Sequence, residues 1–133
     1  MKLTLRCEYA LLALTYLTRR GSEEVSSAET IATAQRIPAR FLEQILLVLK
    51  RARVVTSVKG ARGGYRLARD PRQVTLAEVI RVIDGALAPT ESVSKYFYEP
   101  TPIEKERRLL RVFREIRNLI ADKLEHVTLA DVS

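Results

Sequence analysis

Ten lysine and arginine side chains lie within residues 34–72, where only two acidic side chains accompany them. This segment therefore carries a net charge of +8, whereas the whole chain carries +7. So dense a basic segment favours binding to a polyphosphate, and a solvated basic surface without a partner is the alternative. The ten cations are Arg36, Arg40, Lys50, Arg51, Arg53, Lys59, Arg62, Arg66, Arg69 and Arg72.

Three side chains in this segment have the chemistry needed to read the base edges of double-stranded DNA. Arg40, Glu43 and Gln44 occupy outward positions near the start of a helix predicted after Pro38. Arginine pairs with guanine, glutamine pairs with adenine, and glutamate accepts a hydrogen bond from cytosine. A helix presents such side chains from its N-terminal turns in the major groove.

The chain contains few side chains that could act as a nucleophile, a general base or a soft metal ligand. Its one cysteine, Cys7, and its one histidine, His126, stand at opposite ends of the sequence, which is poor material for a nucleophile–base pair. We therefore predict no enzyme activity. One cysteine excludes an intramolecular disulfide and a cysteine-rich zinc site. The glycine-rich segment 59–64 falls between predicted strands, unlike a phosphate-binding P-loop.

The basic segment begins in a predicted helix-turn-helix. Ser26 and Glu29 form a capping box, which predicts a short helix ending near Ala34. After a turn at residues 35–37, Pro38 suits the first turn of the next helix. The helical spacing of apolar residues predicts that one face of this second helix packs inward. That face comprises Phe41, Leu42, Ile45, Leu46, Leu49 and Ala52.

A β-hairpin is predicted directly after these two helices. Residues 54–58 are rich in β-branched side chains, and residues 65–69 alternate between apolar and polar types. The turn that joins them, residues 59–64, contains three glycines and two cations. A cationic hairpin beside a recognition helix is a wing.

Three further helices are predicted outside this segment. Residues 5–19 form one that is buried on most sides, with Thr4 as N-cap and Gly21 at its end. A second runs from Thr75, which forms a capping box with Glu78, to Asp84–Gly85. Residues 86–101 lack periodicity and predict a loop, whose three aromatic residues 96–98 are expected to cover the core locally.

The third helix, residues 102–125, is the longest and is followed by a short turn near residues 128–131. Its apolar residues form two neighbouring stripes, of which one can pack on its own domain and the other on a second copy. The predicted dimerisation residues are Ile103, Leu109, Leu110, Phe113, Ile116, Ile120 and Leu124.

The predicted fold class is mainly α with a small β-hairpin wing: a winged helix-turn-helix plus a long C-terminal dimerisation helix. Residues 1–85 form the DNA-binding domain, 86–101 a loop and 102–133 the dimerisation segment. No apolar run is long enough to span a membrane, and the start lacks a secretory apolar region. A cytoplasmic protein is expected.

Several motifs resemble the Rrf-two family of bacterial transcription regulators over nearly the whole chain. They are Tyr9-Ala10, Phe41-Leu42-Glu43-Gln44, Val58-Lys59-Gly60 with Gly63-Gly64-Tyr65, Thr75-Leu76 with Glu78-Val79-Ile80, and Asp84-Gly85. The resemblance implies a homodimer that binds a two-fold operator, and we expect a repressor. It also implies that Glu43 and Gln44 face bases and that Lys59 reaches the minor groove. The predicted DNA-binding residues are Thr4, Ser27, Ala39, Arg40, Phe41, Glu43, Gln44, Arg51, Lys59, Gly60 and Arg62.

One departure from the family concerns its iron–sulfur cluster. Several members bind a cluster through three cysteines in the loop before the long helix, but residues 86–101 contain no cysteine. No cofactor is therefore predicted. Glu8, which matches an acidic cluster ligand in some members, is expected to pair with a local cation, either Arg6 or one across the dimer. Two alternatives stay open: an effector, either a metabolite or a protein, sensed through this loop, and a redox or metal role for Cys7.

Overall fold

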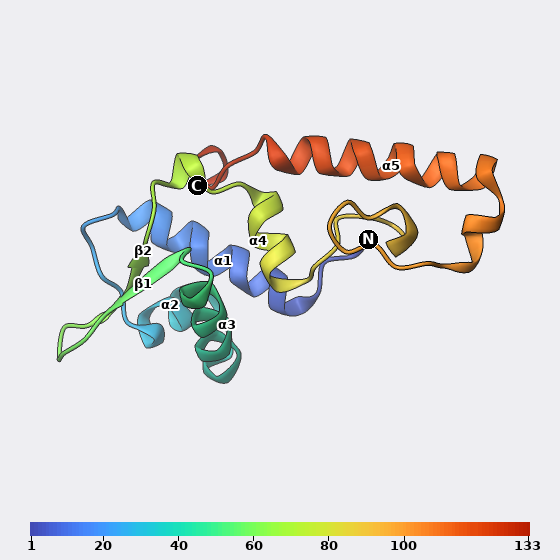
Figure 1. Cartoon of the computed structure of the whole chain (residues 1–133). Helices are drawn as coiled ribbons and strands as arrows, with labels where there is room; N and C mark the ends of the chain where they lie inside the picture. The colour runs from blue at the N-terminus through green and yellow to red at the C-terminus, as the bar shows by residue number, and fades with distance from the viewer.

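Five helices and one antiparallel hairpin make up the chain, all 133 residues of which are described by a computed structural model. The helices are α1 (Leu5–Arg20), α2 (Ala28–Gln35), α3 (Ala39–Arg51), α4 (Leu76–Ile83) and α5 (Arg107–Glu125), and the strands are β1 (Val55–Val58) and β2 (Gly64–Leu67). The predicted class, mainly helical with a small β-hairpin, is confirmed (Figure 1). None of the helices is both long and apolar enough to cross a membrane.

Helix α1 packs against α2, α3 and α4 and forms the centre of the core. Thr4 caps it as predicted, because its side chain accepts a hydrogen bond from the Cys7 backbone N–H at 3.1 Å. The prediction that α1 is buried on most sides was wrong, since Leu5 and Leu12 are 57% and 40% exposed. The core side chains with no exposed surface include Leu14, Ile31, Leu42, Ile45, Leu46 and Leu49.

The N-cap of α2 is Ser27, whose side chain accepts from the Thr30 N–H at 3.1 Å. The prediction of Ser26 as the cap was therefore wrong by one residue. The Ser26 backbone is used elsewhere: its N–H donates to the Tyr65 carbonyl at 2.9 Å, and its carbonyl accepts from the Tyr65 N–H at 2.7 Å. This bridge fastens the start of α2 to the hairpin.

The hairpin pairs Val55 with Leu67 at its base and Val58 with Gly64 near its tip. Gly64 is required by close packing, because a Cβ atom there would lie 2.3 Å from the Ser26 carbonyl oxygen. Gly63 is equally constrained, with 2.1 Å from such a Cβ to the Val58 carbonyl oxygen. These two glycines allow the hairpin to turn and to rest on the start of α2.

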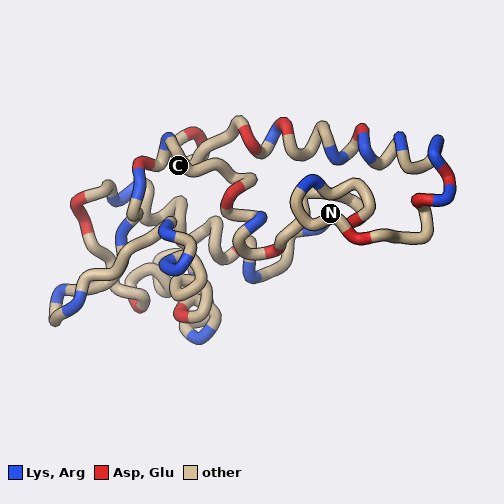
Figure 2. The backbone as a smooth tube through the Cα atoms, viewed as in Figure 1, with Lys and Arg blue, Asp and Glu red and all other residues tan.

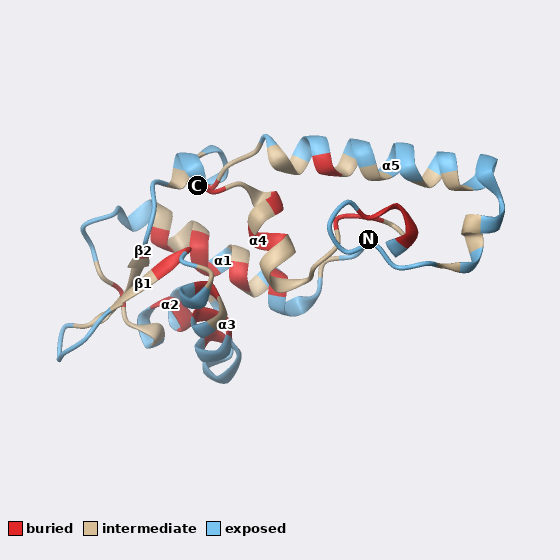
Figure 3. Ribbon diagram, viewed as in Figure 1, coloured by how far each residue is buried: buried red, intermediate tan, exposed pale blue.

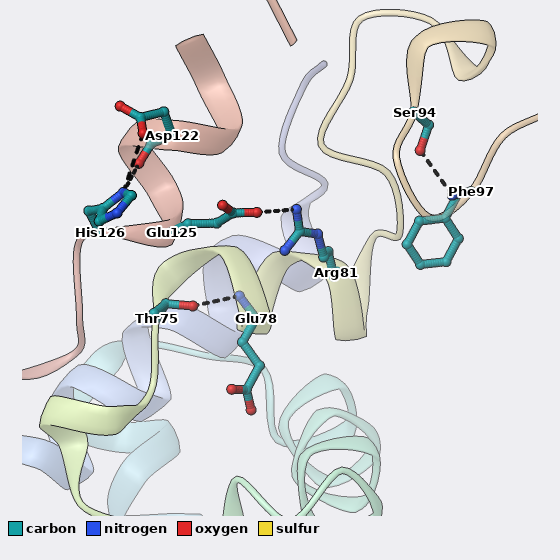
Figure 4. A network of polar contacts seen from close by, with 8 residues as sticks. All are labelled: Thr75, Glu78, Arg81, Ser94, Phe97, Asp122, Glu125 and His126. Atoms are coloured by element: carbon teal, nitrogen blue, oxygen red, sulfur yellow. Dashed lines mark hydrogen bonds and ion pairs between the residues drawn. The ribbon is translucent and has the colours of Figure 1, made fainter. Parts of the chain in front are cut away.

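Helix α4 contacts both the end of the hairpin and α5. Its N-cap Thr75 accepts from the Glu78 N–H at 3.1 Å, and the Glu78 carboxylate pairs with Arg69 at the end of the hairpin. One turn later, Arg81 donates to the Glu125 carboxylate of α5 at 2.7 Å (Figure 4). Because α4 holds both partners, the position of α5 is linked to the base of the wing.

The long helix begins later than predicted. Residues Pro102–Lys105 form a separate 3-10 turn, and the extended backbone of Glu106 interrupts the helix before Arg107. In the preceding loop, Ser92, Val93 and Ser94 are buried, and the Ser94 hydroxyl accepts from the Phe97 N–H at 3.0 Å (Figure 4). The prediction that residues 96–98 cover the core was wrong: all three aromatic side chains are exposed.

Candidate nucleic-acid interface

The start of α3 presents free backbone donors to solvent. Pro38 stands at the N-cap and provides no side-chain hydrogen bond, and the first turn contains no acidic residue. The first N–H groups of a helix have no intrahelical acceptor, and together with the helix dipole they favour an anion such as phosphate. This end of α3 is therefore suited to contact a DNA backbone.

The outward face of α3 carries the predicted base-reading residues. Arg40, Glu43 and Gln44 are exposed, whereas the neighbouring Leu42, Ile45 and Leu46 are completely buried. Glu43 takes part in no ion pair, so neither Arg36 nor Arg40 holds its carboxylate. The arrangement leaves two hydrogen-bonding side chains free on adjacent positions of one helix face.

Ala39 and Phe41 complete the first turn of α3, and both are exposed. The prediction of Phe41 as an inward residue was wrong, because 43% of it remains accessible. Its ring rests against Tyr9 of α1, with 6.1 Å between the ring centroids. Phe41 thus sits at the edge of the helix-turn-helix, where its free side can contact sugar or base methyl groups.

The tip of the hairpin carries exposed Lys59, Gly60 and Arg62. The hairpin and α3 project from the same side of the molecule, opposite α5 (Figure 1). Lys and Arg residues colour this tip blue in Figure 2. The wing tip, which carries these cations, and α3 therefore lie on the same side of the molecule.

Most of the basic segment is not neutralised within the chain. Of its ten cations, only Arg69 and Arg72 form ion pairs, with Glu78 and Asp70. Arg51, in the last turn of α3, is exposed and free of such a pair. The positive field of the segment is thus directed to solvent, as phosphate binding requires.

The remaining predicted residues are already hydrogen-bonded. Thr4 donates its N–H to the Asp84 carboxylate at 3.0 Å, and its hydroxyl lies against the same carboxylate. The Ser27 hydroxyl lies 2.8 Å from the hydroxyl of Thr30, an exposed residue outside the predicted DNA-binding set. The Ser26–Tyr65 bridge places Ser27 beside the Gly64–Tyr65 end of β2, whereas Thr4 lies at the junction of α1 and α4.

The donor set of this chain does not fit an iron–sulfur cluster. Residues 86–101 contain neither cysteine nor histidine, and no group of three potential metal ligands is brought together anywhere in the fold. Glu8 is exposed and does not form the ion pair expected with Arg6. His126 ends α5, with Nδ1 at 2.6 Å from the Asp122 carbonyl oxygen.

Cys7 is completely buried beside Ala77, Ile80 and Leu87. Burial raises the pKa of its thiol to about 12, and the neighbouring Asp84 carboxylate contributes in the same direction. Because the thiolate is the reactive form, the native thiol at neutral pH is expected to react with Ellman's reagent far more slowly than the unfolded one. A Cys7→Ser, Ser22→Cys variant, with its thiol at an exposed position, provides the fast-reacting control. Rapid modification of the native thiol would contradict this expectation and support a redox role for Cys7.

The second candidate surface is the outer face of α5. Figure 3 shows this helix exposed along most of its length. Ile120 and Leu124 pack against the cluster around Cys7, whereas a stripe spaced three, four and three residues apart faces solvent. This stripe comprises Leu109, Val112, Ile116 and Leu119, which are 45%, 50%, 38% and 72% exposed.

The predicted dimerisation set is thus divided between the two faces of the chain. Leu109 and Ile116 belong to the exposed stripe, whereas Ile103, Leu110 and Phe113 are partly buried. Val112 and Leu119 lie outside the predicted set, although their heptad-like spacing with Leu109 and Ile116 is a signal present in the sequence.

Comparisons with known proteins agree with this geometry. Residues 3–133 match the Rrf2 family model, described as iron-dependent transcriptional regulators. An rrf2-like helix-turn-helix regulator of Rhodobacter capsulatus is 39% identical, over 98% of this chain and 91% of its own. The structure of CymR from Bacillus subtilis, 27% identical, superposes with a TM-score of 0.80 over 99% of this chain and 95% of its own. For T. potens IscR, 30% identical, the TM-score is 0.71, with coverage of 99% and 85%. The chain belongs to the Rrf2 family of helix-turn-helix, DNA-binding transcriptional regulators.

Proposed function

We propose that this chain is a homodimeric, sequence-specific repressor that binds a near-palindromic operator in double-stranded DNA. The observation that carries the proposal is the shared orientation of the exposed start of α3 and the cationic wing (Figures 1 and 2). A recognition helix in the major groove with a wing beside it makes use of both surfaces. Selection of binding sites from random DNA tests it, and enrichment of no sequence would contradict specific reading.

The dimer rests on the exposed stripe of α5. Four large apolar side chains at heptad-like spacing are unusual on the surface of a monomer and mark an interaction surface. A two-fold axis through α5 would leave both α3–wing surfaces free, because they lie on the opposite side of the molecule. A two-fold protein recognises a site whose halves are related by the same symmetry.

Within each half-site, the side chains divide into readers and positioning contacts. Gln44 and Glu43 face bases in the major groove, and Lys59 at the wing tip enters the minor groove. Arg51 and Arg62 contact phosphates, which fix the register without reading sequence. Their exposure and their lack of ion pairs support these roles.

Repression is the direct consequence of operator binding in this proposal, because a dimer bound at an operator beside a promoter blocks access to that promoter. We place this action in the cytoplasm, with the chromosome. A signal sensed through the loop at residues 86–101 is the second candidate, and a cavity beside that loop favours it.

Loss of one phosphate contact should weaken binding to every DNA sequence. Arg62→Ala is expected to lower affinity for operator and random DNA alike, because a phosphate contact carries no sequence information. The slope of log affinity against log salt concentration should shrink by about one unit per half-site. Fluorescence anisotropy over a series of salt concentrations measures both quantities.

Arg72→Ala is the matched control, because the Arg72 guanidinium is already paired with Asp70 at 2.7 Å. Its salt slope should stay close to that of the unaltered protein. A loss in Arg62→Ala that is confined to the operator, with random DNA unaffected, would show that Arg62 reads bases instead.

A further inference from the structure

A cavity of about 440 Å³ opens where the first residues of the chain, the end of α4 and the 86–101 loop meet. Its volume lies in the range of small-molecule sites. None of the lining residues belongs to α3, the wing or α5. The cavity is therefore separate from both surfaces assigned above.

The walls of this cavity are held by hydrogen bonds. On one side, the Asp84 carboxylate accepts from the N–H of Thr4, which caps α1. On the other, the Thr101 hydroxyl donates to Ser92 Oγ at 2.7 Å and lies 3.2 Å from the Thr90 hydroxyl. Ser92 is only 5% exposed, so its buried hydroxyl holds the Thr90 and Thr101 hydroxyl groups in place on the loop side of the cavity.

The charges around the cavity favour a ligand with a positive and a negative end. Asp84 and Glu91 both line it, and neither forms an ion pair within the chain. Asp84 also stands at the C-terminal end of α4, where the helix dipole favours a cation. Lys2 is the one lysine or arginine side chain that lines the cavity, and it forms no ion pair within the chain.

We propose that this cavity binds a small zwitterion of the α-amino-acid class, with its ammonium group at Asp84 and Glu91 and its carboxylate at Lys2. The threonine hydroxyls supply further hydrogen bonds at the wall. Binding itself does not depend on DNA, whereas its use as an effector signal rests on the proposed function. The ligand would contact the cap of α1 and the end of α4, and α4 is tied to the wing base through Glu78 and Arg69.

Calorimetry on the full chain, without DNA, tests the proposal with each proteinogenic amino acid as the probe. We expect at least one to bind, and its N-acetyl and amide derivatives to bind about tenfold or more weakly, because each lacks one charged end. Glu91→Gln and Lys2→Met should weaken the same ligand by about tenfold or more. Glu99→Gln, an exposed acid of the same loop outside the cavity, should leave the affinity unchanged.

Glu91 and Lys2 are chosen because both are exposed, so that their substitution leaves the core intact. Asp84→Asn is avoided as the main test, since it would also remove an acceptor that holds the cap of α1. Binding of no amino acid, or unchanged affinity in both variants, would overturn the proposal. Because the titration contains no DNA, a failure of the proposed operator binding would not affect its outcome.

Discussion

A variant carrying both Ile116→Glu and Leu119→Glu is expected to sediment as a monomer. The two side chains are 38% and 72% exposed in the single chain, so their replacement removes no core contact. Across a two-fold interface, the new carboxylates of the two copies would face each other in an apolar environment, where an unpaired charge costs several kcal/mol. Affinity for a two-half-site operator should fall by about a hundredfold or more, because the two DNA-binding units are no longer linked.

Asn118→Glu is the control for each single substitution, because it adds one carboxylate to an exposed polar position of α5. It should remain a dimer and bind the operator normally. Ile120→Glu is unsuitable as a probe of the interface, since Ile120 packs against the cluster around Cys7 and its loss would disturb the fold. An unchanged dimer in the double variant, with its helical circular dichroism intact, would place the interface elsewhere.

Gln44→Ala is expected to cost about 1–3 kcal/mol on the preferred operator and little on random DNA. Gln44 is exposed on α3, one residue after Glu43, and a glutamine can form two hydrogen bonds to adenine. Competition binding against operators altered at one base pair at a time measures the effect. Gln73→Ala, at an exposed glutamine outside the helix-turn-helix, serves as the control.

Glu43→Ala should have the opposite effect on non-specific binding. The carboxylate repels phosphates wherever it finds no base donor, so its removal should raise affinity for random DNA and broaden tolerance at one operator position. If Glu43 instead held Arg40 or Arg36 in place, affinity would fall on every sequence with base preference unchanged, and the absence of any such ion pair argues against this role. If neither variant alters base preference, specificity comes from Arg40, the wing or DNA shape.

Several features of this protein were determined by the sequence alone, because they depend on neighbours a few residues apart. The apolar spacing of α3 correctly predicted that Leu42, Ile45, Leu46 and Leu49 are buried, although it wrongly included Phe41. Thr4 and Thr75 were identified as caps, since a cap requires only its own hydroxyl and an N–H three residues on. The glycine-rich turn predicted the hairpin for the same local reason.

Other features were decided only by contacts between distant segments. Glu29 favoured Ser26 over Ser27 as the cap in sequence, but the bridge between Ser26 and Tyr65 leaves the cap to Ser27. Glu78 could have closed a capping box with Thr75, but its carboxylate pairs with Arg69.

The same holds for the faces of α5. Its two apolar stripes are alike in composition, and the position of α4 and Cys7 determines that Ile120 and Leu124 are covered while Ile116 and Leu119 stay open. Local preferences offer such alternatives at nearly equal free energy. The choice between them is made by burial and pairing with residues far along the chain, which only the folded structure brings together.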